Sequence, residues 1–306
     1  MARSRPSVRQ PRPAQRGHRA QPEKVRQPKP SFEALVEQLV DAGSREHYED
    51  AALYDYEYRR RRADVNFYRD FAKKRLGAGG RILELGAGTG RVTIPLARDG
   101  HHVTALDQAP AMLARLGSRV DAAPGAVRDR IEIARGELCT FELGQKFPLV
   151  IAAFNVLEHL YTRGEVDACL RRVLAHLAPG GAFVFDVQLP DLAWLVRDPA
   201  KRWATTRFTD PQSGRATFYS TNHEYDPVSQ IVMIRLYYDP VDGTPGRVVK
   251  LTQRKFFPAE LEALVAHAGF RVTAHFGDFS FAPLDATADS QVLVCERAEP
   301  RRKTGR

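Results

Sequence analysis

The chain has 306 residues, 43% of them hydrophobic, which is enough apolar content for a packed core in one large domain or two small ones. No apolar run reaches the roughly 18 residues that a membrane span requires, and no apolar segment follows the basic start, so the sequence predicts a cytoplasmic protein. The three cysteines lie far apart, without the spacing of a metal-binding or redox pair.

The net charge of +9 is concentrated at the two ends of the chain. Residues 1–30 hold nine Lys and Arg against one acidic residue, and residues 296–306 hold five against two, which leaves residues 31–295 with a net charge of −2. Residues 1–30 are also rich in Pro and Gln and poor in aliphatic residues, a composition that predicts disorder. We interpret residues 1–30 and 297–306 as solvated basic tails, through which a weak, salt-sensitive attraction to nucleic acid is the alternative.

Two helices are predicted ahead of the main domain. The segment "SFEALVEQLVDAG" has apolar residues at helical spacing behind the Ser31 cap, and Gly43 is expected to end this helix. A second helical stretch covers about residues 57–76. We place the domain itself at residues 31–296.

From Gly80 onward, short β-rich runs alternate with helical ones. This order predicts an α/β fold with a doubly wound, mostly parallel sheet, whose ligands bind at the carboxyl ends of the strands. The predicted strands are at about 81–86, 102–107, 131–136, 147–154 and 181–187, with helices near 90–99, 109–118 and 164–177. A helix starting at Pro258 and two strands at about 270–276 and 290–296 then close the sheet as a hairpin.

Residues 203–257 interrupt this alternation. Strand-like runs such as "ATFYSTNHEYD" and "QIVMIRLYYD" are separated by turn signals, which predicts an antiparallel insertion. We expect the insertion to form a lid or wall over the substrate pocket, or the interface of a homodimer.

The first strand runs into the glycine-rich stretch "LELGAGTGR", residues 83–91. A glycine turn lets a ligand approach the backbone closely, and the next helix offers its positive N-terminus. The dinucleotide fingerprint requires a third glycine where Arg91 stands, so NAD is disfavoured. Glu84, just upstream, suits a ligand that carries a cationic amino acid. Asp107, at the end of the second strand, is placed to bind a ribose diol.

These stretches, with "ALDQAPAML", "ARGEL" and "LVIAAFNVLEHL", resemble the successive motifs of class I S-adenosylmethionine-dependent methyltransferases. The resemblance covers about residues 45–296 and implies a Rossmann-like seven-stranded sheet with S-adenosyl-L-methionine as cofactor. The tyrosines around residues 48–58 make small-molecule members similar to glycine or sarcosine methyltransferases the nearest in character.

The resemblance also implies the cofactor-binding residues. Glu84 and the loop Gly86, Ala87, Gly88 and Gly90 would hold the methionine moiety, and Asp107 with Gln108 the ribose. The adenine would contact Met112 and either Glu137 or Leu138, and Asn155 would face the methyl group. Tyr54 and Arg62 match a tyrosine and an arginine that meet the cofactor in the small-molecule members. An aromatic staple between helices with a solvated arginine face is the alternative for those two.

His159 is the candidate catalytic residue, because a neutral imidazole beside the methyl donor could take a proton from the acceptor. A purely structural role at the start of a helix is the alternative. Some quinone-precursor O-methyltransferases bind a metal through Glu-x-x-Glu-His here, but Asn155 and Val156 leave this chain one carboxylate short, so no metal site is expected.

The sequence therefore predicts an enzyme that transfers a methyl group from S-adenosylmethionine to a small-molecule nitrogen or oxygen nucleophile. Two alternatives stay open. One is an RNA or protein methyltransferase anchored by the basic tails, which the slightly acidic body disfavours. The other is a regulator that binds the cofactor without transferring its methyl group.

Overall fold

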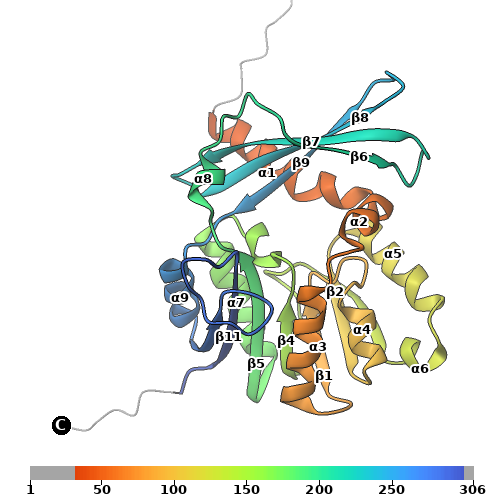
Figure 1. Cartoon of the computed structure of the whole chain (residues 1–306). Helices are drawn as coiled ribbons and strands as arrows, with labels where there is room; N and C mark the ends of the chain where they lie inside the picture. Colours follow the sequence, from red (N-terminus) through yellow and green to blue (C-terminus); the bar gives the residue numbers. More distant parts are fainter. Residues whose placement is uncertain (1–31, 300–306) are drawn as a thin grey trace, which may run out of the picture.

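The computed structural model describes residues 32–299, in which a mixed α/β unit carries a second, antiparallel sheet (Figure 1). The first predicted basic tail, residues 1–30, therefore lies outside the described residues, as do residues 300–306 of the second predicted tail, 297–306. Within the described part of the chain, no helix is long and apolar enough to cross a membrane.

The main sheet has seven strands in the order β10-β11-β5-β4-β1-β2-β3. β10 and β11 form the predicted antiparallel hairpin, and the neighbouring strands from β5 to β3 pair in parallel. The strands are β1 (Arg81–Leu85), β2 (His102–Asp107), β3 (Ile131–Arg135), β4 (Phe147–Ala152), β5 (Leu177–Gln188), β10 (Phe270–Phe276) and β11 (Ser290–Arg297). The doubly wound fold class predicted from the sequence is confirmed.

Helices cover both faces of this sheet, because its central strands are apolar on both sides. In β4, Val150 and Ala152 face one hydrophobic cluster, whereas Leu149 and Ile151 face the other. α7 (Arg163–His176) and α9 (Pro258–His267) belong to the first cluster. α3 (Ala63–Leu76), α4 (Thr93–Arg98) and α5 (Pro110–Asp121) belong to the second, and α6 (Gly125–Arg128) follows α5.

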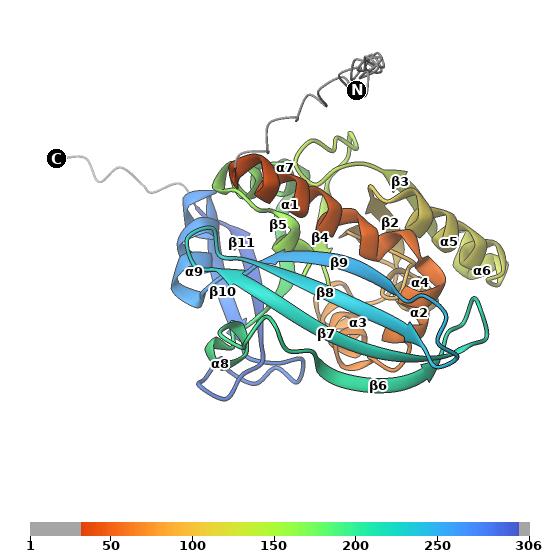
Figure 2. The same ribbon diagram turned by 90° about the horizontal axis from the view of Figure 1, so that it is seen from above.

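The antiparallel insertion is confirmed as a four-stranded sheet in the order β6-β7-β8-β9. It consists of β6 (Trp203–Thr209), β7 (Ala216–Asp226), β8 (Ile231–Pro240) and β9 (Arg247–Arg254), and α8 (Leu192–Leu195) precedes it. Figure 2 shows α1 (Phe32–Glu49) running beside β9, and α2 (Ala51–Tyr58) follows α1. A homodimer through this insertion stays a prediction.

Two local predictions were wrong. Gly43 does not end α1, which continues to Glu49. A Cβ atom at position 43 would lie 2.5 Å from the side chain of Thr252, so glycine is needed here to let the helix pack closely against β9. The predicted helix over 57–76 is two helices, since the four exposed arginines at 59–62 would crowd like charges on one turn. Strand β4 begins at Phe147, as predicted, and includes Pro148, which is tolerated because the pairing with β5 is irregular there.

Candidate functional site

The glycine-rich loop leaves the end of β1 in a backbone conformation that favours glycine. Gly86, Gly88 and Gly90 have φ values of +64°, +55° and +81°. A Cβ on Gly86 would lie 2.4 Å from the side chain of Val156, whereas a Cβ on Gly88 would meet no atom within 4 Å. Gly88 therefore exposes its backbone to open space, and Gly86 allows the loop to pack against the segment that follows β4.

Asp107, the last residue of β2, fixes the glycine loop to the neighbouring strand. One of its carboxylate oxygens accepts a hydrogen bond from the amide of Gly88 at 2.7 Å, and the other accepts from the amide of Ala109 at 2.8 Å. Burial raises the pKa of Asp107 above its ordinary value, and these amides oppose the rise. Each oxygen keeps a second lone pair, so the carboxylate can still accept hydroxyl donors from a ligand.

Glu84 lies behind the loop and is only 2% exposed. Its single side-chain partner among the described residues is the hydroxyl of Thr93, which donates to Oε2 at 2.5 Å. Burial raises the pKa of Glu84 to about 7. An approaching cation would favour the ionised form of this carboxyl group.

A cavity of about 940 Å³ opens at the carboxyl ends of β1, β2, β3 and β4 and is lined in part by α1 and α2. These two helices lie above the ends of the strands in Figure 1. Its volume is at the upper end of the range for small-molecule and cofactor sites, roughly 300–1,000 Å³. Both the glycine loop and the start of α5 border it, and α1 supplies much of its roof. The position is the one that a doubly wound sheet uses for ligands.

The wall near β4 is a strained turn that a buried carboxylate holds in place. Phe154 and Asn155 have φ values of +71° and +62°, which non-glycine residues rarely adopt. Asp186, on β5, accepts their two backbone amides at 2.7 and 3.2 Å and the hydroxyl of Tyr68 at 2.5 Å. This turn places Phe154, rather than the predicted Asn155, in the cavity wall.

Two neutral side chains meet at the cavity wall next to this turn. The hydroxyl of Tyr48, on α1, lies 2.6 Å from Nε2 of His159, at the end of the 3-10 turn η1 (Val156–His159). Burial, together with the charges of His47 and Lys255, lowers the pKa of His159 to about 4. Burial raises the pKa of Tyr48. At pH 7 the pair is therefore a neutral imidazole beside a neutral phenol.

The tyrosine-rich segment is both a staple between helices and part of the cavity. Tyr54 and Tyr58 pack with ring centroids 4.7 Å apart, and His47 packs against both. Tyr54 also lines the cavity. Arg62 does not: it is exposed and stands at the start of α3.

Arg91, which follows the glycine loop, pairs with the buried Asp64 at 2.6 Å. The guanidinium of Arg91 also lies 4.7 Å from the ring centroid of Phe154.

The structure brings most of the predicted site residues to the cavity. Those in its wall are Tyr54, Gly86, Gly88, Asp107, Gln108, Met112, Glu137, Leu138 and His159. Those outside its wall are Arg62, Glu84, Ala87, Gly90 and Asn155. Sequence reasoning missed Arg135, Gly136, Phe154 and Val156 as lining residues. The only signal for the last two was that they flank Asn155 at a strand end.

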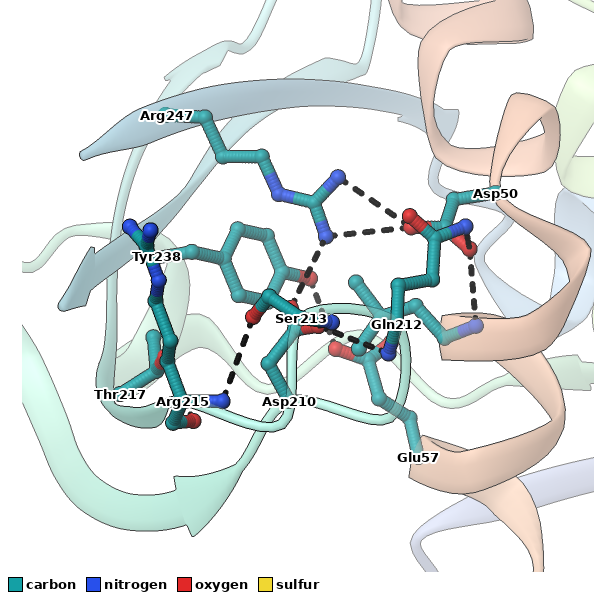
Figure 3. A network of polar contacts seen from close by, with 10 residues as sticks. Asp50, Glu57, Asp210, Gln212, Ser213, Arg215, Thr217, Tyr238 and Arg247 are labelled. Atoms are coloured by element: carbon teal, nitrogen blue, oxygen red, sulfur yellow. Dashed lines mark hydrogen bonds and ion pairs between the residues drawn. The ribbon is translucent and has the colours of Figure 1, made fainter. Parts of the chain in front are cut away.

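The antiparallel sheet contributes no residue to the cavity wall as described; instead it holds α1 and α2 in place. Figure 3 shows a network in which Asp50, the N-cap of α2, accepts hydrogen bonds from Arg247 on β9 and from Gln212 in the β6–β7 turn. Tyr238, on β8, donates to Glu57 on α2 at 2.7 Å. The sheet therefore supports the roof of the cavity, and its role as a wall over the substrate stays a prediction.

A buried ion pair connects the same sheet to η1. Nζ of Lys255, just after β9, lies 2.8 Å from Glu158, and both side chains are at most 1% exposed. Glu158 also accepts the backbone amide of Gln188 at 2.8 Å, and Lys255 donates to the side chain of Gln188. The residue next to His159 is thus anchored to both sheets.

Comparisons with known proteins agree with this geometry. Residues 83–183 match a family described as a methyltransferase domain. The CcbJ methyltransferase from Streptomyces caelestis is 26% identical, with a TM-score of 0.69 over 84% of this chain and 99% of its own. CalS10 from Micromonospora echinaspora, an amino pentose methyltransferase solved with S-adenosylmethionine bound, is 22% identical, with a TM-score of 0.58 over 81% of this chain and 96% of its own. A dTDP-3-amino-3,6-dideoxy-alpha-D-glucopyranose N,N-dimethyltransferase from Streptomyces fradiae is 30% identical over 161 residues, which are 50% of this chain and 59% of that protein.

Proposed function

We propose that this chain, an S-adenosylmethionine-dependent methyltransferase of class I fold, methylates an amine nitrogen of a small molecule. The observation that carries the proposal is the neutral pair of Tyr48 and His159 at the cavity wall. Two of the similar proteins described above are named for amino sugar substrates, which supports the same acceptor class.

The residues of the cavity fit the cofactor. Gly88 leaves open space for a ligand against the backbone, and Asp107 retains lone pairs for two ribose hydroxyls. Glu84, which lies behind the glycine loop and outside the cavity wall, would attract the cationic amino acid end through its buried carboxylate. When bound, S-adenosylmethionine supplies a methyl group that its sulfonium already activates. The chain therefore has to align the acceptor, exclude water and remove one proton.

The proton is the step in which Tyr48 and His159 act. A small-molecule amine is mostly protonated near neutral pH, and its lone pair becomes nucleophilic only after the proton leaves. His159 is neutral at this pH and can accept the proton, either directly or through the hydroxyl of Tyr48, which lies 2.6 Å away.

An amine acceptor is favoured over a hydroxyl acceptor because it avoids the separation of two opposite charges. Moving a proton from an ammonium group to an imidazole keeps one positive charge in the cavity. Moving it from a hydroxyl to an imidazole creates two opposite charges in a buried site, which adds the cost of charge separation at low dielectric. The desolvated pair is therefore better suited to nitrogen than to oxygen.

The experiment is a methyl-transfer assay with S-adenosylmethionine labelled at its methyl group. We expect amino sugars, free or nucleotide-linked, to accept the label, and hydroxyl analogues of the same ring to accept little. The Tyr48→Phe variant should lower kcat about ten- to a hundredfold and leave the KM for the cofactor nearly unchanged. Tyr237→Phe, which removes a hydroxyl from β8 away from the cavity, is the matched control. Equal labelling of the hydroxyl analogues would contradict the proposal.

We further propose that residues 1–30 are not needed for turnover, because residues 31–295 carry a net charge of only −2. Deleting residues 1–30 should leave kcat/KM for the small molecule unchanged. Transfer to RNA or protein that disappears with this deletion would favour the anchored alternative.

A further inference from the structure

A chain of polar groups runs from His159 to the backbone of α1. Nδ1 of His159 lies 3.3 Å from the hydroxyl of Tyr161. That hydroxyl lies 3.1 Å from the carbonyl oxygen and 2.8 Å from the hydroxyl of Thr252, on β9. The Thr252 hydroxyl in turn donates to the carbonyl oxygen of Val40 at 3.2 Å. These polar groups lie on the Nδ1 side of the imidazole, whereas Tyr48 lies on its Nε2 side.

The two carbonyl groups among these partners can only accept, and they set one consistent direction for the hydrogen bonds between them. The hydrogen of the Thr252 hydroxyl is used on the carbonyl of Val40, so this hydroxyl can only accept from Tyr161. The carbonyl of Thr252 can also only accept. The single hydrogen of the Tyr161 hydroxyl therefore points to Thr252, and its oxygen is left to accept from His159.

We propose that Tyr161 is a positioning residue that holds His159 with its proton on Nδ1 and leaves Nε2 free to accept a proton at the cavity wall. The inference rests on the proposed function insofar as His159 is the proton acceptor. The other tautomer would place an N–H group at Nε2, where a proton has to be received, and would leave Nδ1 and the Tyr161 oxygen facing each other as two acceptors.

The geometry also explains why two elements far apart in sequence meet at this histidine. Tyr48 and the carbonyl of Val40 are both on α1, and Thr252 is on β9. The packing of α1 beside β9 therefore supplies both a partner for Nε2 and the end of the chain that orients Nδ1.

The test is nitrogen NMR of the whole protein labelled in histidine, since protonated and bare ring nitrogens have distinct shifts. Comparison with His159→Gln assigns the His159 signals. We expect the wild-type protein to show Nδ1 protonated and Nε2 bare. Tyr161→Phe should mix the two tautomers. Thr252→Val should keep the wild-type tautomer, because it retains the backbone carbonyl that accepts from Tyr161.

Kinetics provide the second measurement. Tyr161→Phe should lower kcat about tenfold or more with the KM for the cofactor nearly unchanged, whereas Tyr237→Phe, on β8 away from the cavity, should stay within about threefold of the wild type. A wild-type His159 protonated at Nε2, or an unaltered tautomer in Tyr161→Phe, would overturn the proposal. The wild-type spectrum needs no variant and no substrate. Failure to find an amine acceptor would therefore count against the proposed function and leave the tautomer measurement standing, whereas an unaltered tautomer in Tyr161→Phe, with an amine acceptor found, would count against this inference alone.

Discussion

Replacing Glu84 with Gln should stabilise the free protein above neutral pH. The side chain is 2% exposed and its pKa is raised to about 7 from an ordinary value of 4.5, so ionising it in the folded state costs about 3 kcal/mol. The folded protein holds this proton more tightly than the unfolded chain. The unfolding free energy is therefore highest below pH 4.5, falls as pH rises from 4.5 to 7, and has lost the full amount above pH 7. Gln keeps the shape and an acceptor for the hydroxyl of Thr93 without the charge.

Urea unfolding of the cofactor-free protein measures this effect. At pH 8 the Glu84→Gln variant should be more stable than the wild type by up to about 3 kcal/mol, and most of the difference should disappear at pH 5. Glu132→Gln is the matched control, because the exposed Glu132 also accepts from a threonine hydroxyl; it should change stability by less than about 0.5 kcal/mol. A Glu84→Gln variant that is no more stable than wild type at pH 8 would refute the reasoning.

The same substitution should weaken cofactor binding. A ligand with a cationic amino acid end prefers the ionised carboxylate, so the wild-type affinity for S-adenosylmethionine should fall as pH drops below 7. Calorimetry on Glu84→Gln should show a lower affinity without this pH dependence. Stability gained and function lost at one residue is the pattern of a site that binding, rather than folding, has shaped. A pH-dependent affinity that survives in the variant would show that another group is responsible.

Three further changes test the site and its supports. Asp107→Ala should weaken binding of the demethylated cofactor by about 1–3 kcal/mol in calorimetry, and unchanged affinity would exclude a ribose contact. Lys255→Met should lower the unfolding free energy by about 3–5 kcal/mol, because it leaves Glu158 buried and unpaired. Adding Glu158→Gln should restore most of this loss, and a double variant as unstable as the single one would contradict the reasoning. Asp50→Ala removes the N-cap of α2 and should lower the free energy of unfolding, measured by thermal denaturation, by about 1–2 kcal/mol. The KM for the cofactor should rise as well, and an unchanged KM would show that the roof of the cavity does not depend on this cap.

Sequence patterns located the strands of the main sheet because the apolar positions within each strand reflect which of its faces are buried. The run at 147–154 is apolar at successive positions, as expected for a strand covered on both faces, and β4 occupies 147–152. The helix boundaries near the N-terminus were less predictable. Gly43 lies within α1 because of its contact with Thr252, a residue more than 200 positions away, and no local pattern encodes that contact.

The residues of the candidate site likewise fall into two groups, those that local sequence predicts and those whose side-chain direction depends on distant contacts. Gly88 and Asp107 were predictable, since each belongs to a strand end that local sequence defines. Arg62 and Asn155 were inferred from the resemblance to methyltransferase motifs. The structure instead turns Arg62 to solvent and places Phe154 in the wall, because Asp186 holds the backbone there at positive φ. Such side-chain directions depend on tertiary partners that spacing alone does not identify.

The antiparallel sheet sets the distance between the two residues of the proposed proton acceptor, although it does not touch the cavity as described. It reaches α1, which carries Tyr48, through Thr252, and it reaches η1, which carries His159, through Lys255. A shift of about 1 Å in either element would open the 2.6 Å contact between Tyr48 and His159 beyond hydrogen-bond range. Substitutions that loosen the contacts of this sheet to α1 and η1 should therefore lower kcat before they change cofactor affinity, because Gly88 and Asp107, which would bind the cofactor, are joined to each other at the ends of β1 and β2.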